Sequence, residues 1–286
     1  MRLQTRSAYW FLAPYLAIFS VFWLWPIIQS FLLSFQNTRV NPWKWQPLFN
    51  WSRLFADPAF YNAFWNTMLI LVIQVPVMVT LATLMAVMLN SKLLKAKGLF
   101  RFAFFAPVVV GEVAYSAVFR LMFNLDFGVI NKLLMSVGLE KISWFSDRTM
   151  AMALIIIAVT WRWAGYNAII ILAGLQSIPE DVYEAATLDK VSKVKQFFFI
   201  TLPLLRPIIV FCVVLSVIGT MQLFTEPFLI TNRGGPGGGT ETLGIFLYRQ
   251  GFTSLNFGYA STIAYTMAGI AIVISLFNMW AGREPK

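Results

Sequence analysis

Four charged residues, Glu112, Arg120, Arg162 and Glu226, stand inside long apolar runs of the sequence. A charge in such a run is costly to keep, so it is by default a hypothesis about function. The chain has no His and one Cys, Cys212, and it has neither a Gly-x-Ser-x-Gly nor a His-Glu-x-x-His pattern. These absences exclude a His base, a zinc site of the His/Cys kind and a disulfide framework. We therefore assign no catalytic residue and no metal ligand, and an intramembrane enzyme is disfavoured.

The elements that hold these charges are apolar enough to cross a membrane. Of the 286 residues, 59% are apolar and 12% are charged, whereas a soluble domain carries about 25% charged residues. A bilayer core of about 30 Å requires ~20 apolar residues as helix. Six segments reach that length: Tyr9–Phe35, Trp65–Leu89, Phe102–Phe123, Thr149–Gly174, Pro207–Leu229 and Tyr259–Ala281. Because lipid admits only helices and closed barrels, and runs this long are not alternating barrel strands, we predict an all-α integral membrane protein. Its six helices form one transmembrane domain over 9–281, with tails at 1–8 and 282–286.

The distribution of Lys and Arg predicts the orientation of these helices. The linking segments on one side, 1–8, 90–101, 175–206 and 282–286, carry 12 Lys and Arg in 57 residues. Those on the other side, 36–64, 124–148 and 230–258, carry 8 in 83. By the positive-inside rule the denser side is cytoplasmic, which places both termini and segment 175–206 in the cytoplasm. The net charge of +10 is scattered between apolar runs, so we expect contact with membrane lipid and no binding of nucleic acid.

Segment 175–206 carries clear signals for two short helices. Ser177 to Glu180 has the pattern of a capping box with a proline in the first turn, so one helix should begin near Ile178. Ser192 marks the start of a second helix, which should end near Pro203. From physics alone, an amphipathic connector on the membrane surface and a docking surface for another protein explain this segment equally well.

The same segment resembles a known family. Glu184-Ala185-Ala186-Thr187-Leu188-Asp189, with the later Phe198, Ile200 and Leu202-Pro203, is similar to the EAA motif in the membrane subunits of ATP-binding-cassette importers. Thr231–Pro236, Thr240–Leu243 and Gly258-Tyr259-Ala260 resemble sugar permeases, in particular the first maltose or glycerol-3-phosphate permease. The chain departs from the family pattern at Lys190, where glycine is usual. Glycine suits a left-handed turn, in which lysine costs about 1–2 kcal/mol, so either the turn differs here or it carries strain.

The resemblance implies a type I importer permease fold with a cytoplasmic coupling helix, in the bacterial cytoplasmic (inner) membrane. It implies as partners a second permease subunit, two ATPase subunits and an external sugar-binding protein. A different chain is the expected second permease, but the sequence leaves open whether it is one. This chain would bind no cofactor and be no enzyme, with ATP and Mg²⁺ held by the ATPases. The coupling residues it implies are Glu180, Glu184, Ala185, Ala186, Asp189 and Lys190. The Gly-rich run 234–239 superficially resembles a phosphate loop, but Thr240 stands where a lysine is required.

The resemblance also makes polar residues in the middle of the spans candidates for a sugar path. An aromatic ring can stack on a sugar ring, while hydroxyls and amides can bond its hydroxyl groups. Residues of these types recur at helical spacing in two spans, and we predict that they line the path: Trp163, Tyr166 and Asn167 in one span, and Ser216, Gly219 and Thr220 in another. Helix packing is the alternative role of such residues, and Gly219 could serve only to let two helices approach closely.

An ion-coupled secondary transporter is the alternative function, since intramembrane charges also form proton relays. Arg120 and Glu226 lie toward the outer ends of their spans, where we expect them to snorkel to the interface. Glu112 and Arg162 are expected to pair across two helices.

Overall fold

The structure is a computed structural model that describes residues 2–91 and 93–282. It divides into two compact units. Unit 1 contains Met1–Phe60 and Phe246–Ala268, and unit 2 contains Tyr61–Ile245 and Gly269–Lys286. The regular structure of the described residues is helical apart from one two-stranded hairpin, as the apolar runs predict.

Unit 1 begins with a long apolar helix that is broken only by a π-helical turn. Its parts are α1 (Arg2–Phe19), η1 (Ser20–Leu24) and α2 (Trp25–Ser34), followed by the antiparallel strands β1 (Gln36–Asn37) and β2 (Lys44–Trp45) and by α3 (Phe49–Ala56). The apolar part, Trp10–Ser34, is long enough to span a membrane. The first predicted span is therefore present as a helix.

A polar cluster ties α3 to the start of α14 (Phe257–Ala281) within unit 1. The Tyr259 hydroxyl donates to Asp57 Oδ2 at 2.8 Å, and the Arg53 guanidinium lies 3.9 Å from the centre of the Tyr259 ring. Burial, and then the positive charge of Arg39, lower the pKa of Arg53. The Tyr259 ring and the Asp57 carboxylate act in the opposite direction and raise the pKa of Arg53.

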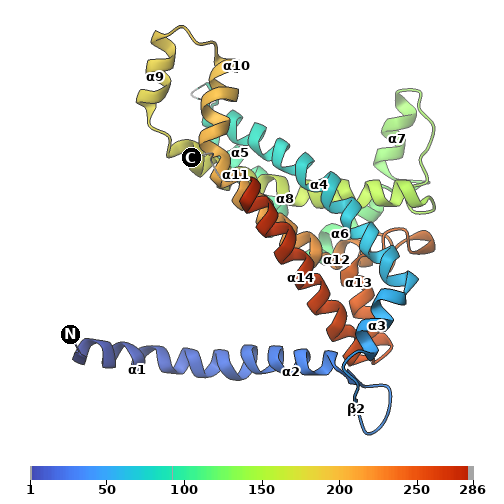
Figure 1. Ribbon diagram of the computed structural model, residues 1–286. Coiled ribbons are helices and arrows are strands. Elements are labelled where there is room, and N and C mark those ends of the chain that lie inside the picture. Colours follow the sequence, from blue (N-terminus) through green and yellow to red (C-terminus); the bar gives the residue numbers. More distant parts are fainter. Residues whose placement is uncertain (1, 92, 283–286) are drawn as a thin grey trace. The chain divides into compact units, whose positions relative to one another are not determined.

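Unit 2 consists of helices packed around the long helix α8 (Figure 1). In chain order its elements are α4 (Pro58–Asn90), α5 (Lys97–Val109), α6 (Glu112–Met122), α7 (Val129–Ser136), α8 (Arg148–Gln176), α9 (Glu180–Leu188), α10 (Lys193–Gln196), η2 (Phe197–Thr201), α11 (Leu202–Met221), α12 (Thr225–Leu229) and η3 (Pro236–Gly238). The helix α13 (Leu243–Tyr248) leads through η4 (Arg249–Thr253) into α14.

The close packing of α8 on α5 depends on one glycine. A Cβ atom added to Gly165 would collide with the backbone carbonyl of Phe104. Since no side chain other than hydrogen fits there, Gly165 sets how closely these two helices approach.

Two predicted spans are not straight helices. The described residues contain five helices long and apolar enough to cross a membrane, and α5 with α6 make a sixth span only as a pair bent by 98°. The prediction of one helix over Phe102–Phe123 was therefore wrong in shape, because Val110 and Gly111 adopt extended backbone between the two helices. The fifth predicted span breaks after Met221 and resumes as α12 at Thr225. Composition alone does not reveal such breaks.

The segment between α8 and α11 contains the two predicted helices, α9 and α10, which run beside each other at one end of unit 2 (Figure 1). The capping-box prediction was wrong: α9 begins at Glu180, and the Ser177 hydroxyl donates to the Gly174 carbonyl at the end of α8 (2.8 Å). Ser192 does cap α10, accepting from the Lys195 backbone N–H. The second helix does not end near Pro203, because the π-helical turn η2 joins α10 directly to α11.

Candidate functional site

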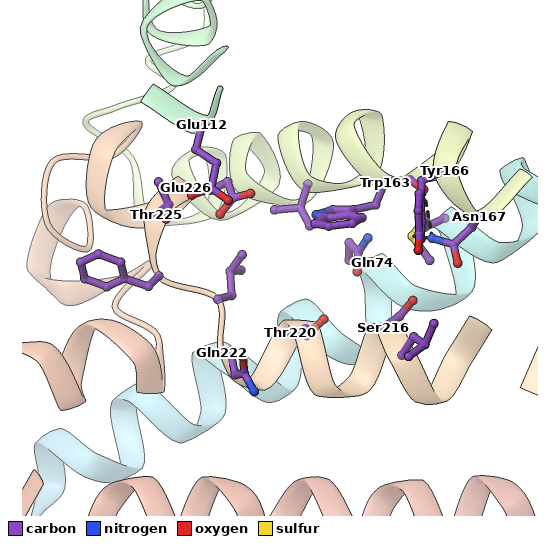
Figure 2. Close-up of a pocket in the computed structure, with 16 residues that line it drawn as sticks. Gln74, Glu112, Trp163, Tyr166, Asn167, Ser216, Thr220, Gln222, Thr225 and Glu226 are labelled. Carbon is purple, nitrogen blue, oxygen red and sulfur yellow. Dashed lines mark hydrogen bonds between the residues drawn. The ribbon is translucent and has the colours of Figure 1, made fainter. Parts of the chain in front are cut away.

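A cavity of about 190 Å³ lies inside unit 2, between α4, α6, α8, α11 and α12. All six residues predicted to line a sugar path line this cavity: Trp163, Tyr166, Asn167, Ser216, Gly219 and Thr220. All of them except Gly219 are labelled in Figure 2. The helical spacing in the sequence placed them on common faces, and the packing of α8 against α11 brings the two faces together. Their role in transport stays a prediction.

The wall formed by α8 is aromatic and held in place by ring contacts. The rings of Trp163 and Tyr166 meet edge to face, with centroids 5.7 Å apart. The centroid of the Tyr166 ring also lies 6.4 Å from that of Phe105. The Asn167 amide donates to the Trp163 carbonyl at 3.0 Å and to Met78 Sδ at 3.4 Å. These contacts fix the rings on the cavity wall with little rotational freedom left to lose on binding a ligand.

The opposite wall is formed by α11 and presents small residues. The Ser216 hydroxyl donates to the Cys212 carbonyl at 2.7 Å, which leaves its oxygen able to accept a further bond. A Cβ atom added to Gly219 would meet nothing within 4 Å. Within this chain, Gly219 therefore does not serve the close approach of two helices, and its missing side chain contributes space to the cavity.

One end of the cavity carries charge. Glu112 and Glu226 lie together there in Figure 2, while Tyr166 and Asn167 lie toward the other end. The predicted pair of Glu112 with Arg162 is present, at 3.8 Å. Arg162 also donates to the Val110 carbonyl at 3.1 Å and lies 4.7 Å from the centre of the Tyr115 ring. Arg162 therefore satisfies backbone that the bend between α5 and α6 leaves open.

The snorkelling prediction for Glu226 was wrong, because its side chain is buried, with 5% exposed, and faces the cavity. Glu226 opens the short helix α12 beyond the break in the fifth span, and a straight helix would have carried it to the membrane surface. Arg120 does lie exposed and donates to the Leu229 carbonyl at 3.3 Å.

The sequence analysis did not assign several of the lining residues to the path: Gln74, Met78, Glu112, Gln222, Thr225 and Glu226. Gln74 stands two residues before Pro76 in the middle of an apolar run. Polar or proline-interrupted positions within hydrophobic segments often mark binding sites in transporters, and that signal could have found Gln74. Met78 lies one turn after Gln74 on α4. Glu112 and Glu226 stood out as charges in apolar runs, but the helix breaks bring them to the cavity together with Gln222 and Thr225.

The predicted coupling residues lie on α9 and the turn after it. Glu180 and Glu184 line a second cavity, of about 850 Å³, between α9, α10 and the ends of α4 and α8. Ala185 is exposed, as are Asp189 and Lys190, whereas Ala186 is buried with 6% exposed. Of the two alanines, Ala185 is therefore the one that the isolated chain leaves accessible to a partner.

The turn at Lys190 is the strained alternative of the two that the sequence left open. Lys190 has a φ of 55°, in the left-handed region that favours glycine. Its N–H bonds to the Thr187 carbonyl at 3.0 Å, and the Val191 N–H bonds to the Ala186 carbonyl at 2.9 Å. These two bonds form a Schellman motif, with lysine at the position where glycine is preferred.

Comparison with known proteins adds the family. Residues 55–283 match the model of a family described as the binding-protein-dependent transport system inner membrane component. The chain belongs to this family. The permease is 44% identical over 280 residues to the lactose transport system permease protein LacF of Rhizobium radiobacter, covering 96% of this chain and 94% of that protein. It is 34% identical over 277 residues to the arabinooligosaccharides transport system permease protein AraP of Bacillus subtilis, covering 96% and 88%.

The fold is also that of a solved importer. The permease superposes on a chain of a bacterial ABC transporter involved in the import of the acidic polysaccharide alginate, with a TM-score of 0.83, 22% identity and 99% of each chain covered. The predicted resemblance and type I importer fold are confirmed. The permease is a multi-pass inner-membrane transport subunit and not an enzyme, and it works with a second permease, ATPase subunits and an external binding protein. None of these relatives supports the ion-coupled alternative.

Proposed function

We propose that this permease passes a sugar from the external binding protein into the cytoplasm through the cavity between α8 and α11. The observation that carries the proposal is the meeting of an aromatic wall and a hydroxyl-bearing wall at one pocket. A cavity of about 190 Å³ holds many times the ~10–15 Å³ that one water molecule requires, which leaves room for a sugar ring. The curated relatives named above carry lactose and arabinooligosaccharides in their names, which supports a saccharide as the substrate here.

Each lining residue has a role that follows from its chemistry. Trp163 and Tyr166 stack against the apolar face of the sugar ring, as aromatic side chains do with flat apolar surfaces. Asn167, Ser216 and Thr220 exchange hydrogen bonds with its hydroxyl groups. The open space at Gly219 holds part of the ring.

The segment after α8 transmits force from the ATPases. In this proposal Glu180, Glu184 and Asp189 make charged contacts with an ATPase subunit, Ala185 allows close approach, and the turn at Lys190 sets the direction of the chain. Ala186 supports α9 from within, since it is buried. ATP and Mg²⁺ are held by the ATPase subunits. Residues 9–281 form one transmembrane domain, with both termini and segment 175–206 in the cytoplasm.

The path is tested by sugar uptake into vesicles that contain the complete transporter. Tyr166→Ala and Thr220→Ala should each lower uptake or change the preference among a panel of sugars. Thr160→Ala is the matched control, because Thr160 is equally buried on α8 but does not line the cavity. Unchanged uptake of every sugar in both cavity variants would remove these residues from the path.

Coupling and orientation need separate tests. Ala185→Trp should block capture of the ATPase, while Val194→Trp, an equally bulky change at an exposed site on the neighbouring helix, should not. Cysteines introduced at Lys193 and Gly238 should react with an impermeant reagent from opposite sides of the membrane, and reaction of both from one side would overturn the proposed orientation.

A further inference from the structure

The charge of the cavity wall is one-sided. Among the lining residues, all of which belong to the described part of the chain, the formally charged ones are Glu112 and Glu226, and neither Lys nor Arg is present. The nearby cation, Arg162, is 5% exposed and lies behind the wall, where it bonds to the Val110 carbonyl and to Glu112. Two carboxylates therefore border the cavity, and they lie at the same end of it (Figure 2).

The two carboxylates differ in how they meet the cavity. The Glu112 side chain is 49% exposed and pairs with Arg162 at 3.8 Å, so its charge is partly compensated. Glu226 is 5% exposed and opens directly into the cavity from α12. Carboxylate oxygens accept hydrogen bonds from pairs of sugar hydroxyls, but they repel another anion, and a water-poor wall weakens this repulsion less than bulk solvent does.

We propose that Glu226 and Glu112 make this cavity selective for uncharged sugars and exclude sugars that carry a carboxylate or a sulfonate. The proposal rests on the proposed function, since it names the substrate class of the same path. At an effective dielectric constant of about 20, one negative charge roughly 8 Å away lowers the local concentration of a monovalent anion by about 30-fold and raises that of a cation by a similar factor. Charge in the cavity is thus large enough to decide between an acidic sugar and its neutral counterpart.

The experiment measures this charge directly and does not depend on what the binding protein delivers. Gly219→Cys places a thiol in the cavity at a position where an added Cβ meets no neighbour within 4 Å. In the complete transporter, the thiol is treated separately with a cationic trimethylammonium-ethyl and an anionic sulfonato-ethyl methanethiosulfonate. The ratio of the two reaction rates is compared with the ratio at Ser136→Cys, an exposed position on α7 outside the cavity. The chain without either change reports any reaction of the buried Cys212.

Because the two factors of about 30 multiply, we expect the cation-to-anion ratio at Gly219→Cys to exceed the Ser136→Cys ratio by up to about 1,000-fold, and Glu226→Gln to lower it by a similar factor. Glu112→Gln should lower it less, because Arg162 already compensates Glu112 in part. A ratio equal to that at Ser136→Cys, or one that neither Gln variant changes, overturns the proposal. Ser216→Cys, which also lines the cavity, replaces Gly219→Cys if the latter does not assemble.

A second readout separates this proposal from the proposed function. Sugar uptake is measured after the thiol has reacted with either reagent. If uptake is blocked but Glu226→Gln does not change the cation-to-anion ratio, the cavity belongs to the path and the charge selection is overturned. A ratio that responds to Glu226→Gln, with uptake unaffected by the reaction, supports the charge selection and removes the cavity from the path.

Discussion

The replacement of Lys190 by glycine should stabilise the turn between α9 and α10. Lys190 has left-handed backbone (φ 55°) at the end of α9, and its side chain is exposed, so the change removes no packing. A non-glycine residue in this conformation costs about 1–2 kcal/mol, while glycine costs roughly 0.5–1 kcal/mol more in lost backbone entropy on folding. The net gain for Lys190→Gly is therefore about 0.5–1 kcal/mol.

Hydrogen exchange measures this gain locally. The amides of Lys190 and Val191 bond to the carbonyls of Thr187 and Ala186, and they exchange when this motif opens. A gain of about 0.5–1 kcal/mol should slow their exchange roughly two- to fivefold. Lys190→Ala is the matched control, because it removes the same charge but keeps the Cβ atom that disfavours the left-handed region.

The result that would refute this reasoning is equal or faster exchange in Lys190→Gly than in the parent chain. Slowing in both Lys190→Gly and Lys190→Ala would assign the effect to the lost charge, and backbone strain would then have no measurable cost in this turn.

Two further changes test the packing of unit 2, and a third tests the segment between α8 and α11. Gly165→Ala should lower thermal stability by about 1–3 kcal/mol or prevent assembly, because its Cβ would collide with α5, while Gly269→Ala, with no neighbour within 4 Å, should be tolerated. Asn131→Ala should cost at least ~2 kcal/mol in a melting experiment, since the buried Asn131 bonds to both backbone groups of Ile142 and each partner left unsatisfied costs about 1–3 kcal/mol. Gln196→Leu breaks a 3.0 Å hydrogen bond to the Val191 carbonyl in the segment between α8 and α11. If this segment transmits force from the ATPases, the number of ATP molecules hydrolysed per sugar transported should rise. An unchanged number would contradict a role of this bond in coupling.

Local patterns in the sequence predicted the helical content and one face of each of two spans. Trp163 and Tyr166 are three residues apart in α8, and Ser216 and Thr220 are four apart in α11, so helical geometry alone puts each pair on one face. The two faces meet at one cavity. The sequence predicted this meeting only through the family resemblance, which implies a shared path. Ser192 was recognised correctly as a cap because the only helix end next to it is the start of α10.

Positions that depend on contacts distant in sequence were not predicted. Ser177 fits a capping box as well as Ser192 does, but it completes α8, and only the three-dimensional end of that helix decides between the two roles. Glu226 was assigned to an outer end because distance along a straight helix was the available guide. The break after Met221 changes that distance, so the buried position of Glu226 follows from the break rather than from its own surroundings in the sequence.

Both helix breaks lie beside the charged end of the cavity, and the physics of the membrane connects these facts. A break frees backbone carbonyls that lipid cannot satisfy, so irregular backbone at membrane depth persists only inside protein or along a cavity. Here the Val110 carbonyl is satisfied by Arg162, and the Leu223 carbonyl by the Thr242 hydroxyl. Each break also begins a new helix with a carboxylate in its first turn, Glu112 in α6 and Glu226 in α12, where the helix dipole favours negative charge. The same breaks that interrupt the spans therefore deliver both carboxylates to the cavity, which is why a polar lining could arise inside segments that are otherwise apolar enough to cross the bilayer.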